Sequence, residues 1–193
     1  MIELTPDNSA AYSNLGVALA RLENTAAARA MYEKSIALSP TYAAYMNLAN
    51  IYSADEKYNL AADTYRKALA LNGGDFRLWG SLARTVLLAH GWNGEAQSLF
   101  EKAATMAEAA LHAQPADGRA WGLLALYDAR LGRKEQAAEH LNQSLIRAPE
   151  DPDALVLAGE VYEMLGRRAE ALHWIQEAAK RGIRWRGCRR IGS

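Results

Sequence analysis

The chain has 193 residues, of which 50% are hydrophobic, and its 22 lysines and arginines balance its 22 aspartates and glutamates. A formal net charge of zero does not provide the broad basic surface that nucleic-acid binding requires, so we expect no nucleic-acid partner. No apolar run approaches the roughly 20 residues that span a bilayer. The first residues also lack the basic and apolar segments of a secretion signal. We therefore expect a soluble chain without direct membrane insertion.

A unit of close to 34 residues recurs along the chain, and its most regular copy runs from Gly118 to Pro149. In that copy, apolar residues return at three- and four-residue steps on both sides of Gly132. This spacing predicts two amphipathic helices joined by a tight turn. Each of five copies has a large residue followed three positions later by a smaller apolar one, in the pairs Tyr12 and Leu15, Tyr45 and Leu48, Trp79 and Leu82, Trp121 and Leu124, and Leu155 and Ala158.

Small residues occupy matched positions in both helices of every copy. Two helices approach closely only where their side chains are small, so these positions predict where the paired helices pack together. The first helices have Gly16, Ala49, Ala83, Ala125 and Gly159, and the second helices have Ala28, Ala61, Ala96, Ala137 and Ala171.

In chain order, residues 1–8 match the end of a preceding repeat, because Ile2–Pro6 aligns with Ile36–Pro40. We interpret this start as that of a piece of a longer protein, with a natural N-terminal cap as the alternative. Five repeats are expected over residues 9–41, 42–75, 76–117, 118–151 and 152–183. Residues 184–193 form an arginine-rich tail that we expect to be disordered. The predicted helices include Ser9–Leu22, Thr25–Leu38, Tyr42–Ala54, Tyr58–Leu71, Asp153–Leu165 and Arg168–Arg181.

The third repeat is longer than the others. Pro115 follows Ala103 by 12 residues, whereas Pro149 follows the equivalent Ser144 by five. The seven added residues make about two helical turns, and the apolar stripe then rotates by only about 20°. We therefore predict one long helix from Asn93 to Ala113. It forms either a local enlargement of the array or a ledge that docks another domain or protomer.

The order of large, small and apolar residues in each unit, W..LG..Y...A...F..A....P, resembles the tetratricopeptide repeat (TPR) family. The resemblance covers the chain from about Ser9 to Ile183. It implies an all-α fold, a right-handed α-solenoid of helix-turn-helix repeats whose first helices line a concave groove. It also implies a protein–protein interaction scaffold that binds a peptide or helix segment in this groove.

Projection of the first helices onto this groove gives a set of candidate peptide-binding residues. An asparagine amide both donates and accepts hydrogen bonds, as a peptide backbone does. Residues four and seven positions apart share one helix face, so Arg77, Ser81 and Arg84 of the third repeat are expected on the same face. The alternative is an ordinary solvated surface. The candidates are Asn14, Asn47, Asn50, Arg77, Ser81, Arg84, Arg119, Leu126 and Arg130.

Two ligand-specific subtypes of the family match these positions only in part. Asn47 and Arg77 fit the clamp that grips the C-terminal carboxylate of chaperones, whereas Ser13, Val17 and Ser81 do not. Asn14 and Asn47 fit the asparagine ladder of arrays that resemble those of sugar transferases, and the ladder stops there. Neither subtype is therefore expected.

Residues for catalysis are not grouped in the sequence. The four histidines lie far apart and lack a metal-ligand spacing such as H-E-x-x-H. The single cysteine, Cys188, has no structured base nearby, and Gly73-Gly74 lacks the Lys-Ser/Thr of a phosphate-binding loop. We therefore predict that the chain is not an enzyme and that it uses no catalytic residue, metal or cofactor. The histidines are His90, His112, His140 and His173.

A second interpretation places the chain in a larger bacterial signalling protein, a kinase or a transcription regulator, as its regulatory or oligomerisation TPR region. The long helix of the third repeat favours this alternative by resemblance. Because no polar capping helix follows the last repeat, self-association through uncapped terminal repeats is also expected.

Overall fold

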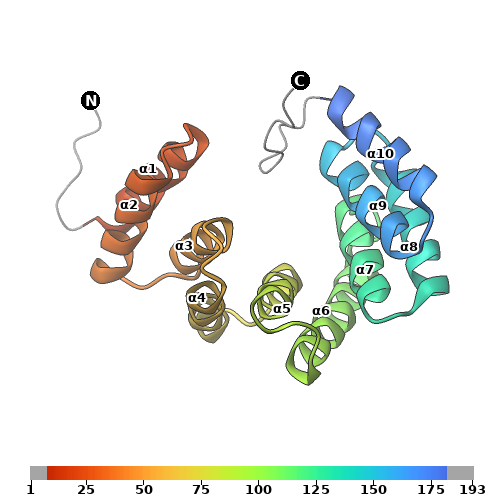
Figure 1. The fold of residues 1–193 in the computed structure, drawn as a ribbon. Helices are drawn as coiled ribbons and strands as arrows, with labels where there is room; N and C mark the ends of the chain where they lie inside the picture. Colours follow the sequence, from red (N-terminus) through yellow and green to blue (C-terminus); the bar gives the residue numbers. More distant parts are fainter. Residues whose placement is uncertain (1–7, 182–193) are drawn as a thin grey trace. The chain divides into compact units, whose positions relative to one another are not determined.

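The computed structural model describes residues 8–181, and the regular secondary structure within this range is all α-helical. The predicted all-α class is thus confirmed, and the predicted helices agree with the observed ones to within one residue at each end. The expectations for residues 1–7 and for the arginine-rich tail with Cys188 lie outside the described residues. The helices, labelled in Figure 1, are α1 (Ser9–Arg21), α2 (Thr25–Leu38), α3 (Tyr42–Ala54), α4 (Tyr58–Leu71), α5 (Phe76–His90), α6 (Gly94–Ala113), α7 (Gly118–Arg130), α8 (Lys134–Arg147), α9 (Pro152–Met164) and α10 (Arg168–Lys180).

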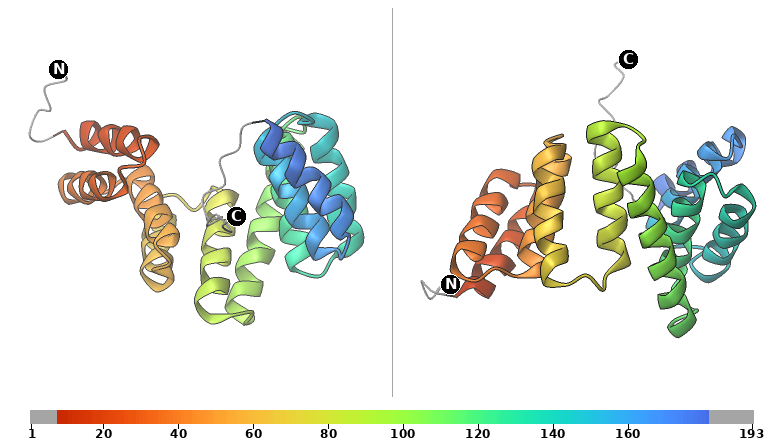
Figure 2. Two further views of the ribbon diagram at one scale, coloured as in Figure 1. Left: turned by 45° about the horizontal axis from the view of Figure 1, so that its top comes forward. Right: turned by 90° about the horizontal axis from the view of Figure 1, so that it is seen from below.

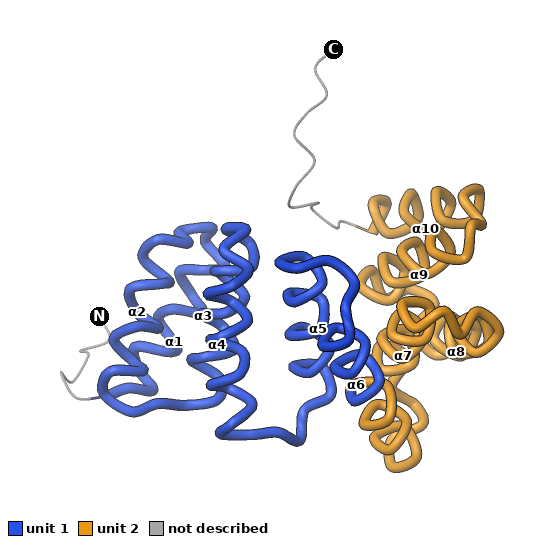
Figure 3. Tube along the Cα trace, turned by 60° about the horizontal axis from the view of Figure 1, so that its bottom comes forward, with its two compact units in different colours: residues 1–102 blue, residues 103–193 orange. Residues whose placement is uncertain are grey.

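The chain divides into two compact units, residues 1–102 and 103–193, which are coloured separately in Figure 3. In the first unit, α1 packs on α2, α3 on α4, and α4 on α5. In the second unit, α7 packs on α8, α9 on α10, and α9 also on α7. Figure 2 shows α1 beside α2 and α9 beside α10. The predicted long helix is confirmed as α6, which begins in the first unit and ends in the second.

Small residues let the paired helices approach closely, as the sequence predicts. Ala28, Ala61, Ala96 and Ala137 are completely buried. A Cβ atom added to Gly16 of α1 would lie 2.6 Å from Cε1 of Tyr32 on α2, which is far inside van der Waals contact. The paired helices therefore meet at these positions with no room for a larger side chain.

Two buried serines add hydrogen bonds across the helix pairs. The hydroxyl of Ser35 on α2 donates to the carbonyl oxygen of Ser9 on α1 at 2.8 Å. The equivalent hydroxyl of Ser144 on α8 donates to the carbonyl oxygen of Gly118 on α7 at 2.7 Å. Both carbonyls belong to the first residue of a helix, so each bond fixes where the two helices of a pair meet.

The turns that follow α1, α3, α7 and α9 each have a left-handed residue two positions after the helix ends. Gly132 and Gly166 adopt φ values of 77° and 75°, and Glu23 and Glu56 adopt 61° and 60°. Glycine enters this region without steric cost, whereas a residue with a Cβ atom is strained there. The first two repeats therefore keep a strained glutamate where the last two have glycine.

Replacement of Ala137 by leucine tests the close packing of α7 and α8. The larger side chain overfills the contact, so we expect the free energy of unfolding to fall by about 1–3 kcal/mol. Urea unfolding followed by helical circular dichroism measures the change. Ala169→Leu is the control because Ala169 is exposed in the same unit; equal stability of Ala137→Leu and the wild type would contradict the packing.

Replacement of Glu56 by glycine tests the strain in the turn between α3 and α4. Relief of the left-handed strain outweighs the added freedom of the unfolded chain, so we expect stabilisation by about 0.5–1 kcal/mol. The reverse change, Gly132→Ala, should destabilise by a similar amount. Thermal unfolding of the two variants measures both effects, and a loss of stability in Glu56→Gly would show that its turn is unstrained.

Candidate functional site

A hollow of about 400 Å³ lies among α3, α4 and α5 of the first unit. It contains two of the predicted groove residues, one from each of two first helices. Its walls are formed by Asn50, Ser53 and Ala54 of α3, Tyr58 and Tyr65 of α4, and Arg84 and Leu88 of α5. We call this site the first-unit hollow.

The hydroxyl of Tyr65 organises the polar part of the first-unit hollow. The Tyr65 ring is buried in the core formed by α3, α4 and α5, and its hydroxyl donates to Oδ1 of Asn50 at 2.6 Å. Burial raises the pKa of Tyr65 to about 12, although the charge of Arg84 and a hydrogen bond from Ser81 act to lower it. The three predicted residues Asn50, Ser81 and Arg84 are therefore brought together around one buried hydroxyl.

The outer part of the first-unit hollow combines a cation with an apolar side chain. Arg84 is exposed, and Leu88, one helical turn further along α5, is 51% exposed. Among the described residues that line the hollow, none is acidic. An incoming carboxylate would therefore meet the positive charge of Arg84 without a competing negative group in the wall.

The other predicted residues of the first unit do not line this hollow. Asn14 is exposed on α1, and Asn47 is half-buried on α3. Arg77 is exposed at the start of α5, where its guanidinium lies 4.4 Å from the centre of the Phe76 ring. These three residues stay candidates for contacts beyond the hollow.

Two of the three predicted residues in the second unit have structural roles. The guanidinium of Arg119 binds the carboxylate of Asp151 through two nitrogens, with Nη2 to Oδ1 at 2.9 Å, and its Nη1 lies 3.1 Å from Oδ2 of Asp153. Arg119 holds the pKa of Asp151 below its usual value. Leu126 is only 8% exposed and packs in the core with Ala137, so it does not face an open groove. Arg130 is half-buried in the last turn of α7.

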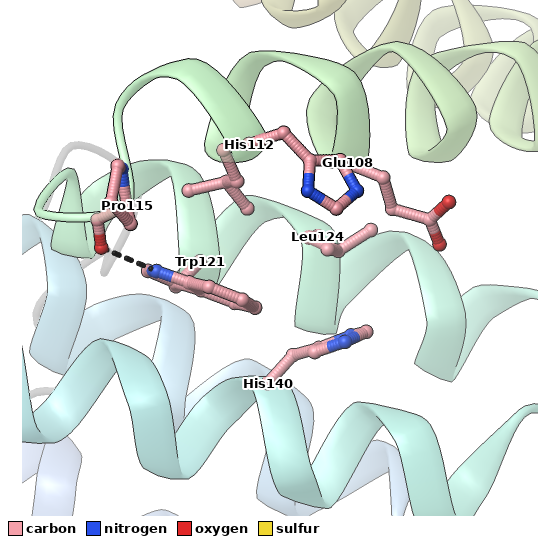
Figure 4. A pocket seen from close by; sticks show the side chains of 7 residues that line it. Glu108, His112, Pro115, Trp121, Leu124 and His140 are labelled. Carbon is pink, nitrogen blue, oxygen red and sulfur yellow. Dashed lines mark hydrogen bonds between the residues drawn. The ribbon is translucent and has the colours of Figure 1, made fainter.

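A second cavity lies in the second unit among α6, α7 and α8 (Figure 4). The sequence analysis does not predict it. This Trp121 pocket has a volume of about 420 Å³. The indole nitrogen of Trp121 donates to the carbonyl oxygen of Pro115 at 3.0 Å, which holds the ring at the pocket wall. The lining residues are Glu108, Leu111, His112, Pro115, Trp121, Leu124 and His140.

A buried acid behind the Trp121 pocket orients His140. Asp128 of α7 is 1% exposed, and its two carboxylate oxygens lie 2.8 Å from Nδ1 of His140 and 3.2 Å from Nη1 of Arg133. The His140 ring in turn packs against Trp121 with a centroid separation of 5.4 Å. The sequence does show that Asp128 is an acidic residue on the apolar face of a first helix. This position does not reveal that its partner is His140, 12 residues later.

Within residues 8–181, no group of three or more histidine, cysteine, aspartate and glutamate side chains is placed to hold a metal ion. In the same part of the chain, no helix combines the length and the apolar character needed to cross a membrane.

Stacked helical hairpins with open hollows between them define a helical-repeat protein of the kind that binds other proteins. A family model for the tetratricopeptide repeat matches residues 2–43, 15–76, 88–145 and 123–183. The chain therefore belongs to the tetratricopeptide repeat family, and the fold class predicted from the sequence is confirmed. Proteins of this family generally act as non-catalytic scaffolds for protein–protein interaction.

Solved structures of TPR proteins share this fold. The TPR protein TTC0263 from Thermus thermophilus aligns with a TM-score of 0.69 and 21% identity over 91% of this chain and 92% of that one. PilF from Pseudomonas aeruginosa gives a TM-score of 0.61 and 21% identity over 92% and 78%. YrrB, described as a TPR protein with an unusual peptide-binding site, gives 0.57 and 22% over 94% and 90%. No match was found among curated protein sequences.

Replacement of Tyr65 by phenylalanine tests the buried hydroxyl through the pH dependence of stability. The pKa of Tyr65 is raised to about 12 from 10.0, so its contribution is complete below pH 10 and is lost as the pH rises towards 12. We expect the wild type to lose about 1–2 kcal/mol more than Tyr65→Phe between pH 9 and pH 12.

Urea unfolding at closely spaced pH values measures this difference. Burial also raises the pKa of Tyr32, Tyr42 and Tyr52, but both proteins contain these residues, so the comparison isolates Tyr65. Parallel stability curves for the two proteins would contradict the buried position of the hydroxyl.

Proposed function

We propose that this chain is a protein-interaction scaffold that binds an extended acidic peptide segment of a partner protein in the first-unit hollow. The observation that carries the proposal is the exposed guanidinium of Arg84 in a hollow without acidic lining residues. A carboxylate of the peptide would form a charge-assisted hydrogen bond with Arg84, which is roughly twice as strong as a bond between neutral groups.

The amide of Asn50 supports a peptide over a small anion as the ligand. Its Oδ1 accepts from the hydroxyl of Tyr65, so its position is fixed and its amide NH₂ group remains able to donate to a peptide carbonyl. A bond of this kind does not depend on the side chains of the peptide. Asn50 therefore supports recognition of an extended backbone next to the carboxylate.

Leu88 and Ala54 supply an apolar contact beside these polar groups. Leu88 is 51% exposed, and both residues line the same hollow as Arg84. Burial of an apolar peptide side chain against them would contribute roughly 25 cal/mol for each Å² removed from water. The preferred segment therefore carries an apolar residue close to its acidic one.

We also propose that the chain has no catalytic activity of its own. The oriented pair of His140 and Asp128 resembles the base and orienting acid of a catalytic triad, but a triad also needs a nucleophile. The described residues that line the Trp121 pocket include no serine, threonine or cysteine. This pair therefore supports a binding role better than nucleophilic catalysis.

Selection from a random peptide library displayed on phage, with the full chain as bait, tests the proposed binding. We expect the recovered peptides to be rich in aspartate and glutamate next to an apolar residue. For a synthetic peptide from this selection, we expect Arg84→Gln to weaken binding about tenfold, which corresponds to about 1.4 kcal/mol. Fluorescence polarisation measures the affinity.

Arg66→Gln is the matched control, because Arg66 lies in the same unit and is already paired with Asp63 and Glu95. It should bind the selected peptide as the wild type does. The proposal fails if the recovered peptides have no acidic preference, or if both substitutions weaken binding equally.

A further inference from the structure

The Trp121 pocket arises from the two added turns of α6. Glu108, Leu111 and His112 all lie between Ala103 and Pro115, the segment that is seven residues longer in the third repeat. Glu108 and His112 of α6 lie on one side of the pocket, and Trp121 and Leu124 of α7 face them (Figure 4). The lengthened helix therefore produces a pocket as well as a longer surface.

The walls of the Trp121 pocket suit a slender side chain with an apolar stem. Leu111 is buried, Leu124 is buried, and the Trp121 ring is held in place by its bond to the carbonyl of Pro115. Pro115 also accepts from Nε of Arg147 at 2.6 Å, which ties α8 to the same carbonyl. The pocket is thus built from fixed groups, and a ligand would lose little energy in reorganising it.

His140 presents a hydrogen-bond acceptor to the Trp121 pocket. The carboxylate of Asp128 only accepts hydrogen bonds, so Nδ1 of His140 carries the proton in their 2.8 Å contact. In the neutral ring the other nitrogen, Nε2, is then an acceptor. Because Asp128 is 1% exposed, this orientation is set from inside the protein and does not depend on a ligand.

Glu108 gives the Trp121 pocket a negative charge. The buried charge of Asp128 is matched by Arg133 at 3.2 Å. The guanidinium of Arg147 donates to the carbonyl oxygens of Pro115 and Gln143 and lies 5.3 Å from the centre of the Trp121 ring, so its positive charge stays beside the pocket. Glu108 is exposed at the pocket wall. Of the described residues that line the Trp121 pocket, Glu108 is the one that carries a carboxylate, and His140 lies across the pocket from it.

We propose that the Trp121 pocket binds the arginine side chain of a partner polypeptide. The guanidinium would donate to the carboxylate of Glu108 and to Nε2 of His140, and its alkyl stem would lie along Leu111 and Trp121. Arginine suits this site because its planar group donates in several directions at once and packs well on aromatic rings. The proposal does not depend on the function proposed for the first-unit hollow.

Nuclear magnetic resonance titration of the full chain at pH 7.5 tests this assignment with two short peptides. The probe is acetyl-Gly-Arg-Gly-amide, and its neutral counterpart contains citrulline in place of arginine. We expect the arginine peptide to shift the indole resonance of Trp121 and the methyl resonances of Leu111 and Leu124. The citrulline peptide should bind at least about fivefold more weakly, because it lacks the charge-assisted hydrogen bond.

The variant Glu108→Gln should weaken binding of the arginine peptide by about five- to tenfold. Glu160→Gln is the matched control, since Glu160 is an exposed acid of the same unit outside the pocket lining. Arg84→Gln should leave this binding unchanged, which separates this test from that of the first-unit hollow. Equal affinity for the two peptides, or equal affinity of Glu108→Gln and the wild type, would overturn the proposal.

Discussion

The close contact between the two helices of a repeat is the constraint on which the rest of the structure depends. It requires a residue without a bulky side chain at the point of contact, such as Gly16 against the ring of Tyr32. Ala61 and Ala137, at the equivalent contacts of other repeats, are completely buried. Because this contact fixes the spacing of each pair, the outward positions of the helices are free to vary. Binding chemistry can therefore differ from one repeat to the next without a change in fold.

The two hollows show how far this variation goes. Arg84 supplies a positive charge to the first-unit hollow, whereas Glu108 supplies a negative charge to the Trp121 pocket. A chain with zero formal net charge thus places an arginine in the lining of one hollow and a glutamate in the lining of the other. In each hollow, a hydrogen bond with a more buried residue orients a polar side chain. The hydroxyl of Tyr65 orients Asn50, and the carboxylate of Asp128 orients His140. Because these hydrogen bonds already hold the Asn50 and His140 side chains in place, a ligand would lose less conformational entropy in ordering them.

The sequence predicts the helices well because their ends and contacts are local properties. The long helix α6 follows from the unbroken apolar stripe, and the buried alanines follow from their spacing. The sites are predicted less well, because they depend on which side chains meet across different helices. Asn50 and Arg84, two residues that projection groups on the first helices, line one hollow. Projection cannot show that Leu126 packs into the core or that Arg119 pairs with Asp151. The contact of His140 with Asp128 has no local signature at all.

Two tryptophans explain how repeats of unequal length remain compatible. The indole nitrogen of Trp79 donates to the carbonyl of Gly73, and that of Trp121 donates to the carbonyl of Pro115, in each case six residues earlier. Each of these carbonyls lies two residues after the last residue of the preceding helix, at Leu71 or Ala113. The position of this tryptophan hydrogen bond between consecutive repeats is thus set by the end of the preceding helix and does not depend on the length of that helix. Whole helical turns added before that end would lengthen the helix, and the next repeat would still begin with the same tryptophan hydrogen bond. Single repeats can therefore grow longer without a change in how the next repeat is attached.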